Sequence, residues 1–283
     1  MPSSWPWGYF PPLTPFRSLG VGMASSKGNR NGRLILYDLM AAPGQRITLV
    51  AELVEETLFT HSPLGGEVLL FLHEGRPVGQ AMTGGDGRAV KPFIPTAVGV
   101  VAVSVRLEHT RRITASESSA RVFVWDRKRP LLIVSLSALA PRSRLPAVGF
   151  PLPDLGATVP PPDGKAVETL SAWARRANLI YVSTADRVEL SGLRQWADGH
   201  RLPSGPFFLV KAGPLGLAHQ LEAWQREGWT NIQGGLVGTP DEARSLVGKG
   251  VKTVLPPSVS SKEKWPDKAI RPKDWAEAQK NFL

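Results

Sequence analysis

Hydroxyl side chains follow two apolar stretches of the sequence that have the character of buried strands. Ser135 and Ser137 follow the apolar run that opens "LLIVSLSAL", residues 131–139, and Ser183 and Thr184 end "LIYVST". A serine attacks a substrate only when a base activates it, and no histidine, lysine or acidic residue lies beside Ser135 in the sequence. Hydroxyls and turn N–H groups can also hold an anion. The pattern therefore leaves two interpretations open: an active site whose base comes from elsewhere in the chain, or a turn that binds anions.

Further polar residues follow later strand-like stretches. Lys211 comes after "GPFFLV", and Gly238 and Thr239 come after "IQGGLV". With Ser183 and Thr184, these three are candidates for holding an anion. Asp241 and Glu242 are candidates for metal ligands because hard divalent cations prefer carboxylate oxygens. Each has a structural alternative, since Thr239 suits a helix N-cap and acidic side chains are favoured in a first helical turn.

The second half of the sequence predicts a parallel α/β sheet that positions these residues. Apolar runs alternate five times with segments of helical periodicity, which is typical of strands joined by helical crossovers. Strands are expected at 131–136, 179–184, 205–212, 230–238 and 251–257, and helices at 165–178, 189–200, 217–228 and 239–250. In such sheets ligands bind beyond the carboxyl ends of the strands, where all the candidate residues fall.

The first half predicts an antiparallel β-sandwich. "RITLVAELVEE" alternates with a period of two, and "GEVLLFLHEGRPVGQAMT" has the pattern of a hairpin, in a region of about seven expected strands. The stretch "PLGGEVLLFLHEGRPVGQAMTGGDGRA" resembles bacterial immunoglobulin-like domains. We expect a Pro-rich, basic arm at 1–32, an immunoglobulin-like sandwich at 33–127, an α/β domain at 128–257 and a tail at 258–283, in which "PKDWAEAQKNFL" predicts a short helix.

The α/β half resembles the haloacid-dehalogenase-like (HAD) phosphatase superfamily, in particular its lipin-type phosphatidate phosphatase branch. Four stretches carry the resemblance: "LLIVSLSAL", "LIYVST", "LRQWADGHRLPSGPFFL" and "GGLVGTPDEARSLVGKGVKTVLP". The resemblance implies a Rossmann-like domain with a magnesium-dependent phosphate site. It places Ser135 and Ser137 where the family has its nucleophilic and acid–base aspartates, and Leu139 where it has a threonine.

The resemblance also assigns the remaining positions of the site. Ser183 fits the phosphate-binding hydroxyl, Lys211 fits the lysine only loosely, and Asp241 or Glu242 fits the late acidic ligand of magnesium. With both aspartates replaced, the resemblance implies a catalytically inactive phosphatase-like protein. It would act as a binding or scaffolding module for phosphorylated or anionic ligands, with no cofactor.

Two alternatives stay open. The first is an active phosphatase or hydrolase that acts on a phosphate ester or phospholipid, requires magnesium, and takes an acid such as Asp154, Asp163 or Asp186 from another loop. The second is a structural subunit of a larger assembly, with the N-terminal arm or the C-terminal tail contacting a protein partner. The stretch "MASSKGNRNG", which begins at Met23, is a more usual start of a protein than residues 1–22. Residues 1–22 are therefore either a native arm or an upstream translation artefact.

The composition excludes some kinds of chemistry and some kinds of partner. The chain has no cysteine, which excludes disulfides and thiolate chemistry, and its five histidines include no pair at ligand spacing. The net charge is +10, yet residues 33–127 hold ten basic and ten acidic side chains while 128–255 hold fifteen against ten. The excess suits an anionic partner, although the absence of an RNA-binding motif or dense basic block disfavours nucleic acid. No apolar run is long enough for a transmembrane helix, so we expect a soluble protein and favour the cytoplasm.

Overall fold

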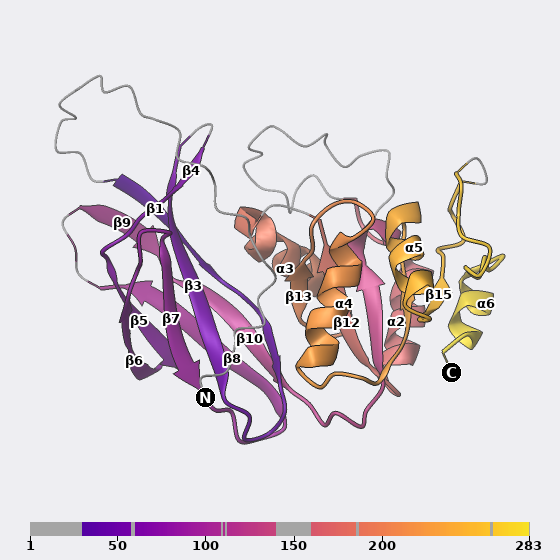
Figure 1. Ribbon diagram of the computed structural model, residues 1–283, viewed down its shortest axis with the longest axis horizontal. Helices are drawn as coiled ribbons and strands as arrows, with labels where there is room; N and C mark the ends of the chain where they lie inside the picture. The colour runs from indigo at the N-terminus through magenta and orange to yellow at the C-terminus, as the bar shows by residue number, and fades with distance from the viewer. Residues whose placement is uncertain are drawn as a thin grey trace.

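The computed structural model describes residues 30–57, 60–108, 110, 112–139, 160–184, 187–260 and 263–282. A β-sandwich forms one half of the molecule and a mixed strand–helix domain the other (Figure 1). Residues 1–29 of the arm expected at 1–32 lie outside the described residues, as do residues 140–159 with Asp154, and Asp186. The sandwich begins at Arg30 rather than at Arg33, because the first strand starts there.

The sandwich consists of two five-stranded sheets. One sheet contains β1 (Arg30–Leu36), β3 (Ile47–Glu56), β4 (His61–Pro63), β7 (Arg88–Phe93) and β9 (Ile113–Ser116). The other contains β2 (Leu39–Ala41), β5 (Val68–His73), β6 (Arg76–Met82), β8 (Gly99–Leu107) and β10 (Ser118–Val124). Inward-facing side chains such as Leu53, Phe71 and Val105 are fully buried between the sheets. The predicted sandwich is confirmed, but it is not antiparallel throughout, because β1 pairs with β9 and β2 with β10 in parallel. It has more strands than expected because β2, β4 and β9 are too short to show a periodicity of their own.

The second domain contains a five-stranded sheet whose neighbouring strands are all parallel. Its strands are β11 (Leu131–Ser135), β12 (Asn178–Ser183), β13 (Phe207–Leu209), β14 (Ile232–Leu236) and β15 (Lys252–Val254). The connecting helices are η1 (Leu136–Ala138), α2 (Gly164–Ala174), η3 (Arg187–Glu189), α3 (Leu190–Gly199), α4 (Gly216–Arg226) and α5 (Pro240–Gly248). The predicted strands and helices are present, and each sheet face is covered by apolar side chains from the helices.

The strand order β13-β12-β11-β14-β15 places β11 at the centre. The chain builds outward from β11 on one side and then crosses to the other side through α4. A topological switch point therefore lies between the carboxyl ends of β11 and β14. Open α/β sheets bind ligands at such a point.

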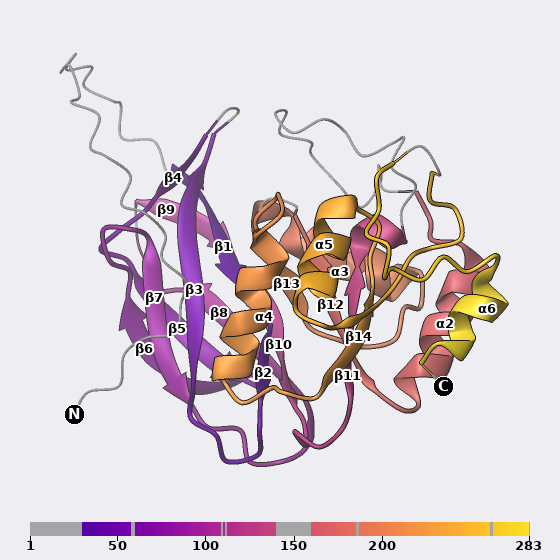
Figure 2. The ribbon, with the colours of Figure 1, turned by 45° about the vertical axis from the view of Figure 1, so that its right-hand side comes forward.

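The C-terminal tail is part of the second domain. Its helix α6 (Trp275–Lys280) packs against α2, and both views show the two helices side by side (Figures 1 and 2). The indole N–H of Trp173 donates to the carbonyl of Gln279 at 2.9 Å, and the ring of Phe282 contacts the Trp173 ring edge-on. The aromatic side chains of the tail thus contribute to the core. None of the helices in the described part of the chain combines the length and apolarity of a membrane span.

The two domains share apolar contacts. Met40, Phe123 and Trp125 come from the sandwich, yet they pack into the core on one face of the parallel sheet, beside residues such as Trp229. Tyr37 packs against the core on the other face. The edge of the sandwich formed by β2 and β10 is therefore buried against the second domain.

Candidate functional site

Ser135, the last residue of β11, and Ser137, in η1, meet a carboxylate from α5. The Ser135 hydroxyl donates to one oxygen of Glu242 at 2.6 Å, and the Ser137 hydroxyl donates to the other at 2.8 Å. The two hydroxyl oxygens are also 2.8 Å apart. Ser135 is 1% exposed and Glu242 is 6% exposed, whereas Ser137 is half-buried. An acidic residue thus reaches the serines from a distant part of the sequence.

Glu242 is held in place by the start of its own helix. Its carboxylate accepts the backbone N–H of Thr239 at 3.1 Å, and the Thr239 hydroxyl accepts the N–H of Glu242 in return. This is a capping box, which satisfies two helix-end donors at once. Gly238 allows the approach, because a Cβ there would lie 2.3 Å from the Ser137 carbonyl oxygen. The arrangement fastens the turn after β14 onto the turn after β11.

The other predicted site residues are placed around this group rather than in it. Ser183 ends β12 beside β11, Thr184 is exposed, and Lys211 is exposed beyond β13. Asp241 points outward and pairs with Arg244 at the surface. The structure therefore brings together Ser135, Ser137, Gly238, Thr239 and Glu242, at the switch point of the sheet.

Carboxylates suited to a metal are not assembled in the described part of the chain, where no three histidine, aspartate or glutamate side chains are grouped as an ion would require. Asp163, one of the acids considered for a hydrolase, caps α2 by accepting the N–H of Lys165 and also accepts the indole N–H of Trp275 at 2.9 Å. Its carboxylate is thus used in packing α2 against α6.

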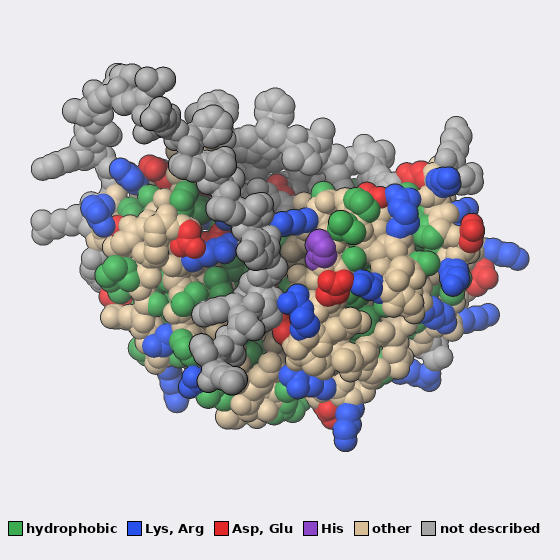
Figure 3. Space-filling model, in the orientation of Figure 1, with side chains coloured by type: hydrophobic (Ala, Val, Ile, Leu, Met, Phe, Trp, Pro, Cys, Tyr) green, Lys and Arg blue, Asp and Glu red, His purple; other side chains and the backbone are tan. Residues whose placement is uncertain are grey.

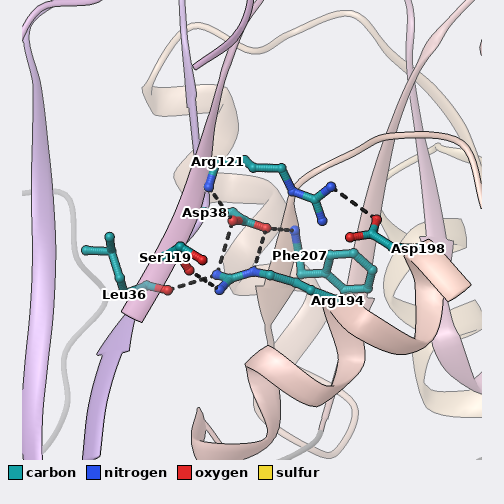
Figure 4. A network of polar contacts seen from close by, with 7 residues as sticks. All are labelled: Leu36, Asp38, Ser119, Arg121, Arg194, Asp198 and Phe207. Carbon is teal, nitrogen blue, oxygen red and sulfur yellow. Dashed lines mark hydrogen bonds and ion pairs between the residues drawn. The ribbon is translucent and has the colours of Figure 1, made fainter. Parts of the chain in front are cut away.

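A second polar cluster lies between the domains and was missed by sequence reasoning (Figure 4). Asp38, 1% exposed, accepts hydrogen bonds from the backbone N–H groups of Arg121 and Phe207 at 2.9 and 3.0 Å. The guanidinium of Arg194 lies 3.1 Å from the Asp38 carboxylate and also donates to the carbonyls of Leu36 and Ser119. Burial lowers the pKa of Arg194, and Asp38 opposes that shift. Every charged group in the cluster is thus compensated, as a buried ion pair requires.

A similar buried carboxylate on β3 also joins the two domains. Glu52, 1% exposed, accepts a hydrogen bond from the Nε–H of Arg88 at 2.8 Å, and Nη2 of Arg88 lies 2.7 Å from the same oxygen. The other oxygen of Glu52 is 2.7 Å from a guanidinium nitrogen of Arg187, in an ion pair without hydrogen-bond alignment. Burial, followed by Glu52, raises the pKa of Tyr37, which keeps that phenol neutral. Arg187 and Arg194 are two helical turns apart on one continuous segment, so a single face of η3 and α3 docks onto the sandwich.

A groove opens beside the Asp38 cluster. It has a volume of about 640 Å³ and is lined by β1, β10 and α3. Three arginines on its walls are each paired with a carboxylate, as in Arg33–Glu56, Arg121–Asp198 and Arg194–Asp38. The other polar side chains on the lining make no hydrogen bond to a described residue; they are Ser116, Glu117, Ser118, Ser119, Ser191 and Gln195. The groove therefore offers hydrogen-bonding groups with little excess charge.

Comparison with known proteins gives no family assignment. Neither a protein-family model nor a curated protein matches the chain. Among solved structures, the fibronectin(III)-like modules of Clostridium thermocellum CbhA are 13% identical over 34% of this chain and 47% of that chain, with a TM-score of 0.26. The D00-D0 domain of intimin is 20% identical over 34% and 46%, with a TM-score of 0.25. Domains 4 and 5 of the S-layer protein SbsC are 13% identical over 33% and 44%, with a TM-score of 0.22.

These similarities cover about a third of this chain and less than half of each of those proteins. At such identities and TM-scores they carry no inference about activity.

The expected membership of the HAD superfamily is wrong. No family model and no curated protein matches the chain, and no phosphatase is among the solved structures named above. The stretch that resembled the lipin-type segment most has another physical role here. Its Arg194 binds Asp38 of the sandwich, Trp196 is buried in the core, and Gly205 is needed because a Cβ would lie 2.2 Å from the Leu179 carbonyl oxygen.

Proposed function

We propose that this chain is a non-catalytic binding protein in which the two domains act as one unit and the interdomain groove holds the ligand. The observation that supports this most is the buried Asp38–Arg194 cluster. It fixes the wall formed by α3 against the wall formed by β1 and β10, so the groove is preorganised. Preorganised sites bind more tightly because less conformational freedom is lost on binding.

The lining favours a polar ligand without a large net charge. The three arginines are matched by Glu56, Asp198 and the buried Asp38, so a phosphate dianion would find no uncompensated cation there. Serine hydroxyls and the Gln195 amide can both donate and accept, as the peptide group does. An extended polypeptide segment fits this chemistry best.

Selection of random 12-residue peptides displayed on phage tests the proposal. Peptides enriched on the wild-type protein should bind it, and the double variant Ser119→Trp with Gln195→Trp, which fills the groove, should weaken them at least tenfold. A matched control places tryptophan at exposed Gln80 and Ser258, away from the groove, and should leave affinity unchanged. Equal binding to the groove-filled variant would place the ligand elsewhere and reject this site.

One observation favours a second candidate function, a serine hydrolase. The 2.6 Å contact between Ser135 and Glu242 has the geometry of a nucleophile beside a base. Ser135 is 1% exposed, so a substrate would reach it only after the surrounding turns open. A fluorophosphonate probe separates the two candidates. Labelling that is lost in Ser135→Ala would establish a reactive serine, whereas the binding proposal expects no labelling.

A further inference from the structure

The amino edge of the parallel sheet carries a concentration of positive charge. The turn 126–129 before β11 lies at its centre and contacts the ends of two helices. Arg129 donates to the carbonyl of Ala174 at the end of α2 at 2.8 Å, and Arg127 donates to the carbonyl of Glu227 after α4 at 2.9 Å. These contacts bring together what we call the basic face: Arg127, Lys128, Arg129, Arg175, Arg176 and Arg226, all exposed.

The charge of the basic face is poorly compensated. Arg127 and Arg129 donate to neutral carbonyl and amide oxygens, so their charges persist. The side chains of Lys128, Arg175 and Arg176 make no hydrogen bond or ion pair with any residue that the structure describes. Three acidic residues, Asp126, Glu222 and Glu227, lie on the same segments. Glu222 pairs with Lys249, and burial raises the pKa of Glu227. Cations at the ends of α2 and α4 do complement the helix dipoles, but six exceed what two helix ends use.

We propose that the basic face docks this protein onto a membrane surface rich in anionic lipid. Figure 3 shows lysine and arginine side chains along the lower edge of the α/β half, where Figure 1 places the turn below the sheet. Basic side chains close to a membrane surface are attracted to its anionic lipids. Each such side chain strengthens membrane binding by about fivefold. Attraction of this kind needs charge alone and no inserted apolar segment.

Nucleic acid fits the face less well. Proteins that recognise duplex DNA place a helix or strand in a groove, whereas this face is built from turns and helix C-termini. Binding of single strands relies on exposed aromatic rings, and the tryptophans nearest these segments, Trp173, Trp224 and Trp229, are each at most 1% exposed.

Sedimentation with vesicles tests the proposal. The full chain should bind phosphatidylcholine vesicles that contain 30% phosphatidylserine at 0.1 M NaCl, bind phosphatidylcholine alone negligibly, and be released at 0.5 M NaCl because salt screens charge. The triple variant Lys128→Glu, Arg175→Glu, Arg176→Glu should lose at least about a hundredfold in affinity. The control reverses Arg76, Arg106 and Lys165, which are exposed cations on the sandwich and at the opposite end of α2, and should bind like the wild type.

Three outcomes would overturn the proposal: equal binding by the triple variant, binding that ignores the anionic lipid, or tighter binding to a 20-base-pair DNA duplex than to the vesicles. The groove-filled variant should bind vesicles normally, so this test is independent of the peptide-binding proposal.

Discussion

At the scale of single residues, two carboxylates from the sandwich connect its strands to the second domain. Asp38 and Glu52 are each 1% exposed, and each meets an arginine from the segment that forms η3 and α3. A buried ion pair adds little net stability over an apolar pair, but removing one partner leaves an uncompensated charge. These arginines therefore determine which surfaces can pack together.

Substitution of one partner should be costly. Arg194→Met leaves Asp38 without its cation and is expected to lower the free energy of unfolding by about 3–5 kcal/mol, measured by urea denaturation. The control is Arg121→Met, whose partner Asp198 is 62% exposed at its side chain; this pair should cost about 1 kcal/mol or less. Equal effects of the two substitutions would show that burial of the Asp38 cluster has no energetic consequence.

Two glutamates at the end of α4 should give opposite pH dependences. Burial raises the pKa of Glu227 in the folded state above about 4.5, the pKa of the unfolded group. Protonated Glu227 therefore stabilises the fold fully below about pH 4.5, and this stabilisation is lost as the pH rises through the folded-state pKa. A hydrogen bond from Lys249 lowers the pKa of Glu222, which stabilises the fold above the same pH and is lost as pH falls through the folded pKa. Glu227→Gln should therefore raise the melting temperature at pH 7, and Glu222→Gln should lower it.

Thermal scans from pH 3 to pH 7 measure both effects. The two differences from wild type should shrink toward acidic pH. Shifts of the same sign in the two variants would contradict the assigned environments.

At the scale of elements, the tail behaves as a structural helix. Trp275 is 7% exposed, its indole donates to Asp163, and the hydroxyl of Thr169 donates to its carbonyl. The α6 helix thus covers an apolar face of α2 that would otherwise be open to water.

Removal of the Trp275 side chain should destabilise the whole second domain. Trp275→Ala is expected to cost about 3–5 kcal/mol, because it removes a large buried ring and leaves a cavity. Lys280→Ala, on the exposed side of α6, should change stability by less than about 0.5 kcal/mol. Chemical denaturation of the two variants makes the comparison, and a small effect of Trp275→Ala would indicate that α6 docks loosely.

Periodicity predicted most elements of the fold but only part of the site. The buried runs around Ile133 and Ile180 and the amphipathic α2 and α5 have strong local patterns, so their types followed from the sequence. The serines after β11 could be placed at the sheet edge for the same reason. That Glu242 would bind them depends on the strand order, which has no local signature. Asp38 did leave a signal, as a lone carboxylate inside the apolar run "LILYDLMAA".

At the scale of the whole molecule, both polar and apolar contacts join the sandwich to the α/β domain. The Asp38 and Glu52 clusters fasten η3 and α3, while Arg127 stacks on Trp229 with 5.5 Å from its guanidinium carbon to the ring centre. The shared core that contains Phe123 and Trp125 lies between these polar contacts. The preorganised groove and the basic face that we propose both depend on these contacts.

The absence of cysteine makes a direct measurement straightforward. Spin labels on Arg106→Cys of the sandwich and Arg176→Cys of the second domain, both exposed positions, allow the interdomain distance distribution to be measured by double electron–electron resonance. We expect a single narrow distribution that broadens when Arg187 and Arg194 are both replaced by methionine. A broad or multimodal distribution in the protein with both arginines intact would contradict it.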